Sequence, residues 1–587
     1  RMSNPRGQTR SPTLAPRRAG PGPFALLRRA VERLLGLTEL VRVRRRIAER
    51  IGAGAGLGTF LRETFAELGI RAEVPAADLE RVPRAGPLLV VANHPHGLLD
   101  GLLLANRLQP LRADLRILGN RWLARFPELR DSVIPVDPID PAAGPTNVAG
   151  MRTALRHLQG GGCLLVFPAG KVAARSWRQR GIHDDAWSPT IARLQQRSGA
   201  TVLPIHIAGS NSRLFQLAGL IHRRLRTWLL VRETLNKRGS VLHARIGNPI
   251  APAGLTRFPE GAELVAYLRL RTEILARRQS PGADRPARRR PSLLAAVAPS
   301  LGRGKLARDV GGLLPSQRLA TLGPLEAWYA YAPQIPHVLR EIGRLRELTF
   351  RAVGEGTGRP IDLDEFDSHY VHLFLWNPRE REVVGAYRIG HVEHILVAGS
   401  RAGLYTHTLY DYDERFLAHV TPGLELGRSF VVAAWQRQFQ PLLLLWRGIA
   451  SYVARQPDNC VLFGAVSISD RHHDVSKHLM LDHLSRYMHP ELSMLVQPRQ
   501  PVPVKDPHLL PLCWTDAMVA DLGTVSAMVA EIEAEARGVP VLLREYLKLG
   551  GQLVGLNVDP NFGSSITALV VLDLRRTDPR LLGRYMG

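Results

Sequence analysis

A stretch rich in Pro, Gly and Arg, from residue 276 to 312, constrains the fold of this chain more than any other feature. It contains SPGADRPARRRP and LGRGKLARDVGG without a clear hydrophobic period, which is typical of an interdomain linker. A chain of 587 residues suggests about two to four domains, and this break divides it into two parts of similar length. We therefore predict a basic arm with an amphipathic helix over 1–50, a domain over 51–275, a linker over 276–312 and a second domain over 313–587.

Both parts alternate short apolar runs with helical patterns. In the first part we expect strands at Pro87–Ala92, Cys163–Phe167 and Thr201–Ile207. In the second part we expect, in order, a helix, two strands and a helix, near Ile335–Phe350, Val371–Trp376, Val383–Ile389 and Pro441–Val453. Strands separated by helices are typical of α/β folds, so we predict two α/β domains. No apolar run approaches the ~18–20 residues that cross a membrane, and no transmembrane helix is expected.

The charge of the chain is strongly positive. Lys and Arg number 78 against 52 Asp and Glu, a formal charge of +26, and residues 1–50 alone hold 13 Arg and three acids. Positive charge attracts polyanions without saying which one. No helix-turn-helix, RNP-type or zinc pattern accompanies it and 6% of residues are aromatic, so nucleic acid is not expected as a partner. From Phe24 a helical period puts Val31 and Leu34 on one face; such a basic helix lies on an anionic membrane surface or packs on its own domain.

A polar block follows the first apolar run directly. Asn93–Gly101 reads NHPHGLLDG. A histidine with a nearby carboxylate is a general-base arrangement, in which Asp100 fixes the tautomer and the imidazole removes a proton from an attacking hydroxyl. A polar turn that caps the next helix would have the same composition, so this block alone leaves both interpretations open.

Four blocks in order then resemble the glycerolipid and lysophospholipid acyltransferases, in the branch named for haemolysins. After NHPHGLLDG come VIPVD at Val133–Asp137, FPAGK at Phe167–Lys171 and VLPIHIAGSNS at Val202–Ser212, and the resemblance covers roughly residues 80–260. It implies an O-acyltransferase with His94 as the base and Asp100 as its partner. Five residues separate these two where the family has four, which leaves His96 as the alternative base.

Further residues of this part are expected to bind substrate. The resemblance implies contacts from Asn93, His96, Phe167, Pro168, Gly170 and Lys171. An anionic head group or a carrier phosphate is expected to contact Gly119, Asn120 and Arg121, because the arginine guanidinium is a bidentate hydrogen-bond donor. The alternative is that Arg121 is a solvated surface arginine. Ala169 stands where the family has Glu in a block that helps to bind glycerol phosphate, which implies an acceptor with another head group.

The second part carries its own polar blocks. In order along the chain these are RLRELTF, IDLDEFD at Ile361–Asp367, VVGAYR and ELGR. Their acids and histidines have no clean metal spacing, and the three cysteines lie far apart, so no metal site is expected. The order resembles the acyl-homoserine-lactone synthases and the carrier-dependent N-acyltransferases that make ornithine lipids, both of the GNAT superfamily, over about residues 335–580.

This second resemblance implies roles for a set of acids and arginines that fall on the family's pattern: Arg346, Asp364, Asp367, Arg388, Glu425 and Arg428. Glu425 is expected to be the base that deprotonates an amine acceptor. Asp364 and Asp367 either hold a cationic amino acid or pair with arginines and brace the fold. Trp435–Gly448 lacks the Gly-rich turn that cradles coenzyme A, so we expect acyl-(acyl carrier protein) as the donor, with acyl-CoA still open, and no bound cofactor.

Together the two parts resemble the fused, bifunctional ornithine-lipid synthases. The resemblance implies N-acylation of ornithine, or a similar amino acid, with a 3-hydroxyacyl group, followed by O-acylation of the lyso-lipid. The alternative is a lysophospholipid acyltransferase with a non-catalytic GNAT-like half. The expected partners are acyl carrier protein, the amino acid, the lyso-lipid and an anionic membrane surface. The basic arm then predicts peripheral attachment at the cytoplasmic face of the inner membrane.

Overall fold

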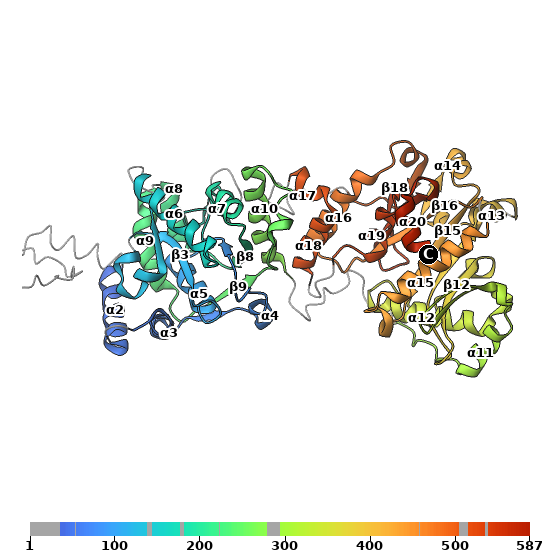
Figure 1. The fold of residues 1–587 in the computed structure, drawn as a ribbon, viewed down its shortest axis with the longest axis horizontal. Coiled ribbons are helices and arrows are strands. Elements are labelled where there is room, and N and C mark those ends of the chain that lie inside the picture. The colour runs from blue at the N-terminus through green and yellow to red at the C-terminus, as the bar shows by residue number, and fades with distance from the viewer. Residues whose placement is uncertain are drawn as a thin grey trace, which may run out of the picture. The chain divides into compact units, whose positions relative to one another are not determined.

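The computed structural model of the chain divides into two compact units, Arg1–Arg278 and Gln279–Gly587 (Figure 1). It describes residues 36–52, 55–121, 123–137, 144–175, 181–221, 223–278, 294–398, 400–456, 458–503, 515–533 and 538–586. The basic helix predicted from Phe24 lies outside the described residues. Near the end of the stretch predicted as a linker, α11 (Arg303–Gly311) is a helix whose Leu306 and Val310 are buried.

The first unit is built on a 7-stranded sheet in the order β1-β9-β8-β2-β5-β3-β4. Its strands are β1 (Arg71–Glu73), β2 (Leu88–Ala92), β3 (Leu115–Asn120), β4 (Val133–Val136), β5 (Cys163–Val166), β8 (Thr201–Ile207) and β9 (Val241–Ile246). The strands predicted around β2, β5 and β8 are confirmed. All five residues of β2 are buried, which explains its unbroken apolar sequence LLVVA. A two-stranded ribbon, β6 (Ala174–Arg175) with β7 (Ile182–His183), lies outside this sheet.

Helices lie between and around these strands (Figure 1). They are α2 (Leu37–Ile51), α3 (Leu57–Leu68), α4 (Ala76–Leu79), α5 (Leu98–Leu108), α6 (Gly144–Gln159), α7 (Thr190–Ser198), α8 (Arg213–Ile221), α9 (Arg223–Asn236) and α10 (Gly261–Glu273). Five neighbouring strands of the sheet are parallel to one another, in the order β8-β2-β5-β3-β4. Strand β9 pairs with β8 in the antiparallel direction. The carboxyl ends of the parallel strands therefore share one edge, which is where open α/β sheets place their ligand sites.

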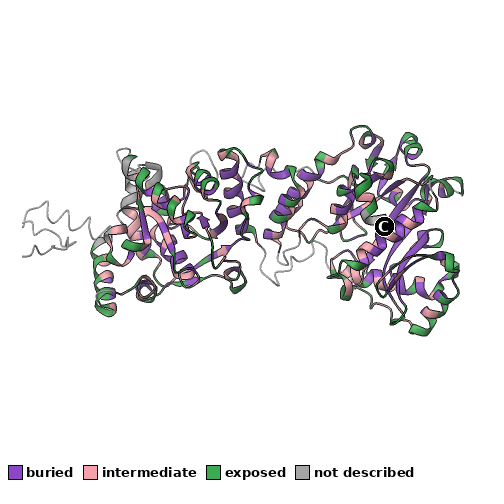
Figure 2. Cartoon of the chain, viewed as in Figure 1, coloured by how far each residue is buried: buried purple, intermediate pink, exposed green. Residues whose placement is uncertain are grey.

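The second unit is built on an 8-stranded sheet in the order β10-β11-β12-β13-β15-β16-β19-β18, most of which is buried (Figure 2). Its strands are β10 (Arg318–Leu322), β11 (Leu325–Tyr331), β12 (Val371–Asn377), β13 (Glu382–His391), β15 (Gly423–Val431), β16 (Val461–Ile468), β18 (Gln552–Asp559) and β19 (Ser565–Asp573). A small ribbon pairs β14 (Tyr410–Tyr412) with β17 (Val496–Pro498). The helices are α11, α12 (Pro336–Ala352), α13 (Val392–Ala398), α14 (Glu414–His419), α15 (Gln440–Ala454), α16 (Asp474–Leu484), α17 (Asp516–Ala520), α18 (Leu522–Ile532), α19 (Val541–Lys548) and α20 (Pro579–Met586). The helix, two strands and helix predicted here are confirmed as α12, β12, β13 and α15, so both units have the predicted α/β class.

One pair of strands in this sheet, β15 and β16, separates along its length. The two run parallel and pair over Gly423–Glu425 and Val461–Phe463, and no pairing between them continues in the part of the chain that the structure describes. Gly464 directly follows the last paired residue of β16. A Cβ at this position would lie 2.1 Å from the carbonyl oxygen of Leu426, so the close approach requires glycine. Beyond this point the strands diverge into a wedge.

The described helices contain no stretch that is both long and apolar enough to span a lipid bilayer.

Candidate active sites

The NHPHGLLDG block joins the carboxyl end of β2 to α5. The chain turns at Gly97, whose φ of 88° is one that glycine adopts without strain. Asp100 lies in the first turn of α5 and accepts the backbone N–H groups of His96 and Gly97, both at 2.9 Å. This carboxylate thus stabilises the helix N-terminus and fixes the loop that carries the histidines.

The same carboxylate also lies beside His94. Nδ1 of His94 is 2.9 Å from Oδ2 of Asp100, a close contact without the geometry of a hydrogen bond. Asp100 is fully buried, whereas the His94 side chain is 18% exposed. The imidazole therefore has a buried carboxylate on one side and an accessible edge on the other, the arrangement that a general base needs.

The two histidines of the block differ in their surroundings. His96 is 2% exposed, its Nε2 lies 3.0 Å from the carbonyl oxygen of Ala208, and burial lowers its pKa. The ring of His94 instead stacks on Phe167, with 4.3 Å between ring centroids. The geometry therefore favours His94 over His96 as the group that meets a substrate, although the assignment of the base stays a prediction.

The remaining blocks reach the same edge of the sheet. Phe167 and Pro168 follow β5, and a turn closes as Gly170 N–H donates to the carbonyl of Phe167 at 2.9 Å. Lys171 Nζ lies 3.8 Å from Asp185. The cation that Lys171 adds to this block, two residues after Ala169, is thus partly neutralised by a carboxylate of the same unit.

The expected head-group contacts lie at the ends of β3 and β4. Gly119 and Asn120 are the last residues of β3, and Arg121 follows them. Arg121 Nε is 3.6 Å from Asp137, and its side chain is 58% exposed. The structure therefore gives this arginine both a protein partner and access to solvent.

Two residues brace the loop. Asn93 donates to the carbonyl of Ile207 at 2.9 Å and accepts its N–H at 2.7 Å, which ties the loop after β2 to β8. Asp184 was not predicted: it accepts the N–H of His94 at 3.1 Å and the indole N–H of Trp187 at 3.1 Å, and burial raises its pKa. Ninety residues separate Asp184 from His94, and nothing in the local sequence around Asp184 indicates this contact.

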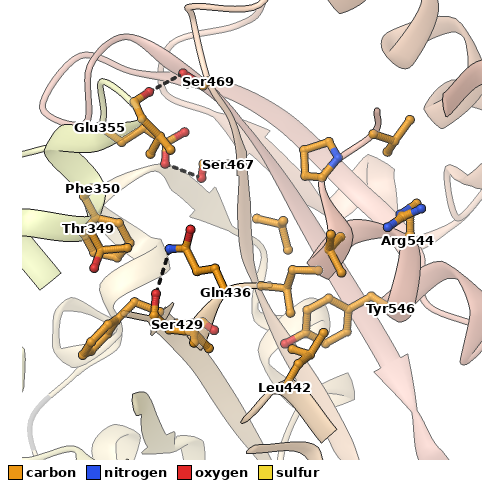
Figure 3. Close-up of a pocket in the computed structure, with 18 of the residues that line it drawn as sticks. Thr349, Phe350, Glu355, Ser429, Gln436, Leu442, Ser467, Ser469, Arg544 and Tyr546 are labelled. Carbon is orange, nitrogen blue, oxygen red and sulfur yellow. Dashed lines mark hydrogen bonds between the residues drawn. The ribbon is translucent and has the colours of Figure 1, made fainter. Parts of the chain in front are cut away.

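In the second unit, the wedge between β15 and β16 opens into a cavity of about 1220 Å³ (Figure 3). Residues from both strands line it, together with the end of α12, the start of α15 and part of α19. Peptide groups on the inner edges of the two strands face no sheet partner across the wedge within the described chain. Such donors can polarise a carbonyl oxygen that enters the cavity.

Arginines and aspartates form a buried cluster beside this cavity. Arg346 donates to Asp367 at 2.7 Å, and Arg388 is 3.3 Å from Asp367 and hydrogen-bonds Asp364. Burial raises the pKa of Asp367, but the charges of Arg346 and Arg388 outweigh burial and hold that pKa below its usual range. Arg428 lies 3.5 Å from Asp364. The aspartates of DLDEFD are thus paired within the protein.

Arg428 also approaches Asp362, for which the motif predicted no role. Its Nη2 lies 3.7 Å from Asp362, and the guanidinium stacks over the rings of Tyr405 and Phe562, 5.0 Å from each centroid. Burial raises the pKa of Asp362, partly offset by Arg428. Asp362 could have been found from its place at the start of the acidic run IDLDEFD.

Glu425 is 1% exposed, and its carboxylate is engaged by three donors. Thr406 N–H donates to one oxygen at 2.6 Å, while Tyr405 N–H at 3.1 Å and the hydroxyl of Tyr370 donate to the other. Glu425 is not among the residues that line the cavity. Its predicted role as the base stays untested, and its contacts are those of a bracing carboxylate.

No group of three or more His, Cys, Asp or Glu residues that could hold a metal ion occurs in the described ranges of the chain.

In comparisons with known proteins, two family models match different parts of the chain. Residues 57–280 match the family described as acyltransferase, and residues 345–447 match the acetyltransferase (GNAT) domain. The chain is 30% identical over 244 residues to the glycine N(alpha)-acyltransferase of Bacteroides thetaiotaomicron, covering 39% of this chain and 71% of that protein. It is 28% identical over 247 residues to the protein of the same name from Phocaeicola vulgatus, covering 39% and 73%.

A third relative is named for ester rather than amide formation. The chain is 26% identical over 213 residues to the lyso-glycine lipid O-acyltransferase of Phocaeicola vulgatus, covering 33% of this chain and 74% of that protein. The chain is therefore an acyltransferase that joins an acyltransferase domain to a GNAT domain, and it belongs to the family that includes the glycine N(alpha)-acyltransferase of Bacteroides thetaiotaomicron.

Proposed function

We propose that the chain is a bifunctional acyltransferase that makes an amino-acid lipid in two steps. The second unit transfers a 3-hydroxyacyl group from acyl carrier protein to the α-amine of an amino acid. The first unit then esterifies the new 3-hydroxyl with a second acyl chain. The observation that carries the proposal is that each unit has a candidate site of its own, the His94–Asp100 pair in one and the wedge cavity in the other.

The first site suits ester formation. The exposed edge of His94 can take the proton of a hydroxyl while Asp100 stabilises the resulting imidazolium. The hydroxyl oxygen then attacks the thioester carbonyl, and the thiol leaves with the proton that the histidine carries. Ala169, in place of the acid that the family uses toward glycerol phosphate, supports an acceptor without that group.

The second site suits amide formation from a carrier-bound thioester. Arg437, Arg471 and Arg544 line the wedge cavity and offer charged donors to the phosphate of a pantetheine arm. Backbone N–H groups along the wedge can bind the thioester carbonyl oxygen as negative charge develops on it. A carrier protein brings one such phosphate, and the cavity provides for it without a Gly-rich turn.

The acceptor of the amide step is an amino acid, and two candidates follow from different observations. Ornithine follows from the resemblance of the two fused halves. Glycine follows from the names of the relatives and from the pairing of Asp364 and Asp367 with arginines, which leaves these carboxylates without free charge for a cationic side chain. Both amino acids present the same α-amine to the thioester, and the mass of the product distinguishes them.

Peripheral attachment to an anionic membrane surface belongs to the same proposal, because the lyso-lipid and its product reside in the bilayer. On α2, Val43 and Ile47 are buried in the core of the first unit. The opposite face carries Arg42 and Arg45, whose side chains are 69% and 80% exposed. This helix can therefore pack on its own domain and still present cations to lipid.

Expression in a host without amino-acid lipids tests the proposal, with lipid extracts analysed by mass spectrometry. We expect a phosphorus-free lipid with one amide and one ester, and its head-group mass identifies ornithine or glycine. His94→Ala should lower the rate of ester formation by about 10²–10⁴-fold, so that the monoacylated lyso form accumulates.

The matched control is His243→Ala, because His243 is an exposed histidine of the same unit that pairs with Glu73. It should leave the diacyl lipid at the wild-type level. A diacyl lipid made at the normal rate by the His94 variant would contradict the role of His94. Absence of any new amino-acid lipid, with faster turnover of lysophosphatidic acid, would contradict the bifunctional proposal and favour a lysophospholipid acyltransferase.

A further inference from the structure

A buried carboxylate, Glu355, lies at the wall of the wedge cavity. Glu355 follows α12 and lines the cavity, as Figure 3 shows. One of its oxygens accepts the hydroxyl of Ser467 on β16 at 2.9 Å, and the other accepts the hydroxyl of Ser565 on β19 at 3.1 Å. The residue is 5% exposed. A buried carboxylate is thus held at the cavity wall by two rotatable hydroxyls.

Glu355 and Glu425 differ in what they can do chemically. The oxygens of Glu425 accept two backbone N–H groups and a tyrosine hydroxyl, away from the cavity. Each oxygen of Glu355 accepts one serine hydroxyl, which leaves lone pairs for a further proton. Of these two glutamates, Glu355 is the one that combines access to the cavity with a free acceptor site.

The charges around Glu355 suit proton transfer at neutral pH. Burial raises its pKa to about 7, the two serine hydroxyls act in the opposite direction, Asp559 on β18 raises it further, and Arg428 on β15 lowers it. A base is most effective when its pKa lies near the working pH. The environment therefore places this carboxylate in the range that a general base requires.

We propose that Glu355 is the general base of the amide-forming site and takes a proton from the α-ammonium of the amino acid that enters the wedge cavity. This inference rests on the proposed amide-forming function. The freed amine attacks the thioester carbonyl carbon, and a C–N bond forms. The C–S bond then breaks, the second proton of the nitrogen passes to the departing sulfur, and Glu355 returns its proton to solvent. The products are one amide, one thiol and one proton.

Glu355→Gln in the full chain tests the inference, with acyl-(acyl carrier protein) and glycine or ornithine as substrates. We expect kcat for amide formation to fall by about 10²–10⁴-fold. In the wild type, kcat/KM should fall as the pH drops below about 7, because the carboxylate becomes protonated. In the variant this acidic limb, the fall in kcat/KM below about pH 7, should disappear. The rate of amide formation by the variant should recover at higher pH, because more of the amino acid is then present as the free amine. A purely structural role would not restore the rate in this way.

The matched control is Glu533→Gln, since Glu533 lines the same cavity but accepts the backbone N–H of His473. It should keep both kcat and the acidic limb. Ser467→Ala keeps Glu355 but removes one donor to its charged form, so the limb should move to higher pH. This variant decides the question if Glu355→Gln fails to fold.

Each outcome separates the two proposals. If the wild type forms no amide with either amino acid, the proposed function fails. If the wild type forms the amide but Glu355→Gln keeps its kcat and pH profile, the inference about Glu355 is wrong. A wild-type profile without a limb near pH 7, or a limb that Ser467→Ala leaves in place, also overturns it.

Discussion

Arg346 and Arg388 are 0% exposed, a placement that is costly unless each guanidinium is paired and hydrogen-bonded. Their partners are Asp364 and Asp367 from the acidic run after α12. The sequence left two interpretations of these aspartates open, substrate binding or bracing. These ion pairs support bracing, because the arginines already occupy the carboxylates. Sequence alone could name these residues through their motif, but not which charges neutralise each other in the core.

Replacing one of the buried arginines should therefore destabilise the second unit. Arg346→Met removes one of the two arginines that pair with the buried Asp367. We expect the free energy of unfolding to fall by about 3–5 kcal/mol. Arg340→Met is the matched control, because Arg340 is exposed on the same helix and should change stability by no more than about 0.5 kcal/mol. Calorimetry of the full chain measures both. Equal transition temperatures for the two variants would show that the pair does not stabilise the fold.

At the scale of elements, the separation of β15 from β16 creates the second site. Tyr387 of β13 faces an irregular stretch of β15, where the pairing shifts between Ala386 and Arg388. Arg428 lies in this stretch with a φ of 50°, in the left-handed region that a non-glycine residue adopts at a cost of about 1 kcal/mol or more. The bulge redirects Arg428 toward the aspartates. Periodicity in the sequence predicts strands, but the divergence of two paired strands depends on non-local packing.

Gly464 should be essential at the vertex of the wedge. In Gly464→Ala the new Cβ would overlap the Leu426 carbonyl, so we expect a loss of about 1–3 kcal/mol as the strands shift. The control is Gly427→Ala, where an added Cβ meets no atom within 4 Å. The transition temperature of the second unit should drop for the first variant and stay near the wild type for the second. If the two variants were equally stable, the strands at Gly464 would tolerate the added Cβ, and the prediction would be wrong.

At the scale of the whole molecule, one chain carries two acyltransferase domains of different kinds. Under the proposed two-step function, covalent linkage would keep the lyso-lipid product of one site at a high effective concentration for the other. The Pro/Gly/Arg-rich break indicated two domains, and the structure divides into two units at Arg278. The +26 charge suggested a polyanionic partner but did not identify it.

The attachment of the whole molecule to a membrane can be tested through α2. Arg42→Ala combined with Arg45→Ala should weaken binding to vesicles that contain phosphatidylglycerol by about 2 kcal/mol, or roughly 30-fold, at about 1 kcal/mol per cation. Arg415→Ala is the control, because Arg415 is an equally exposed arginine, paired with Asp413, on the second unit. Sedimentation with vesicles measures the binding. If the double variant and the control sediment alike, α2 does not contribute to membrane binding.

The sequence by itself determined the α/β class, the strands around LLVVA, and the motif residues His94 and Asp100. Local propensity, hydrophobic period and the wording of short motifs carry this information, because each depends on residues near one another in the chain. Only the tertiary structure decided which histidine is exposed, that Asp184 supports the loop of His94, and that Glu355 rather than Glu425 lines the cavity. These depend on burial and on contacts between residues far apart in sequence, and burial is set by how whole strands and helices pack.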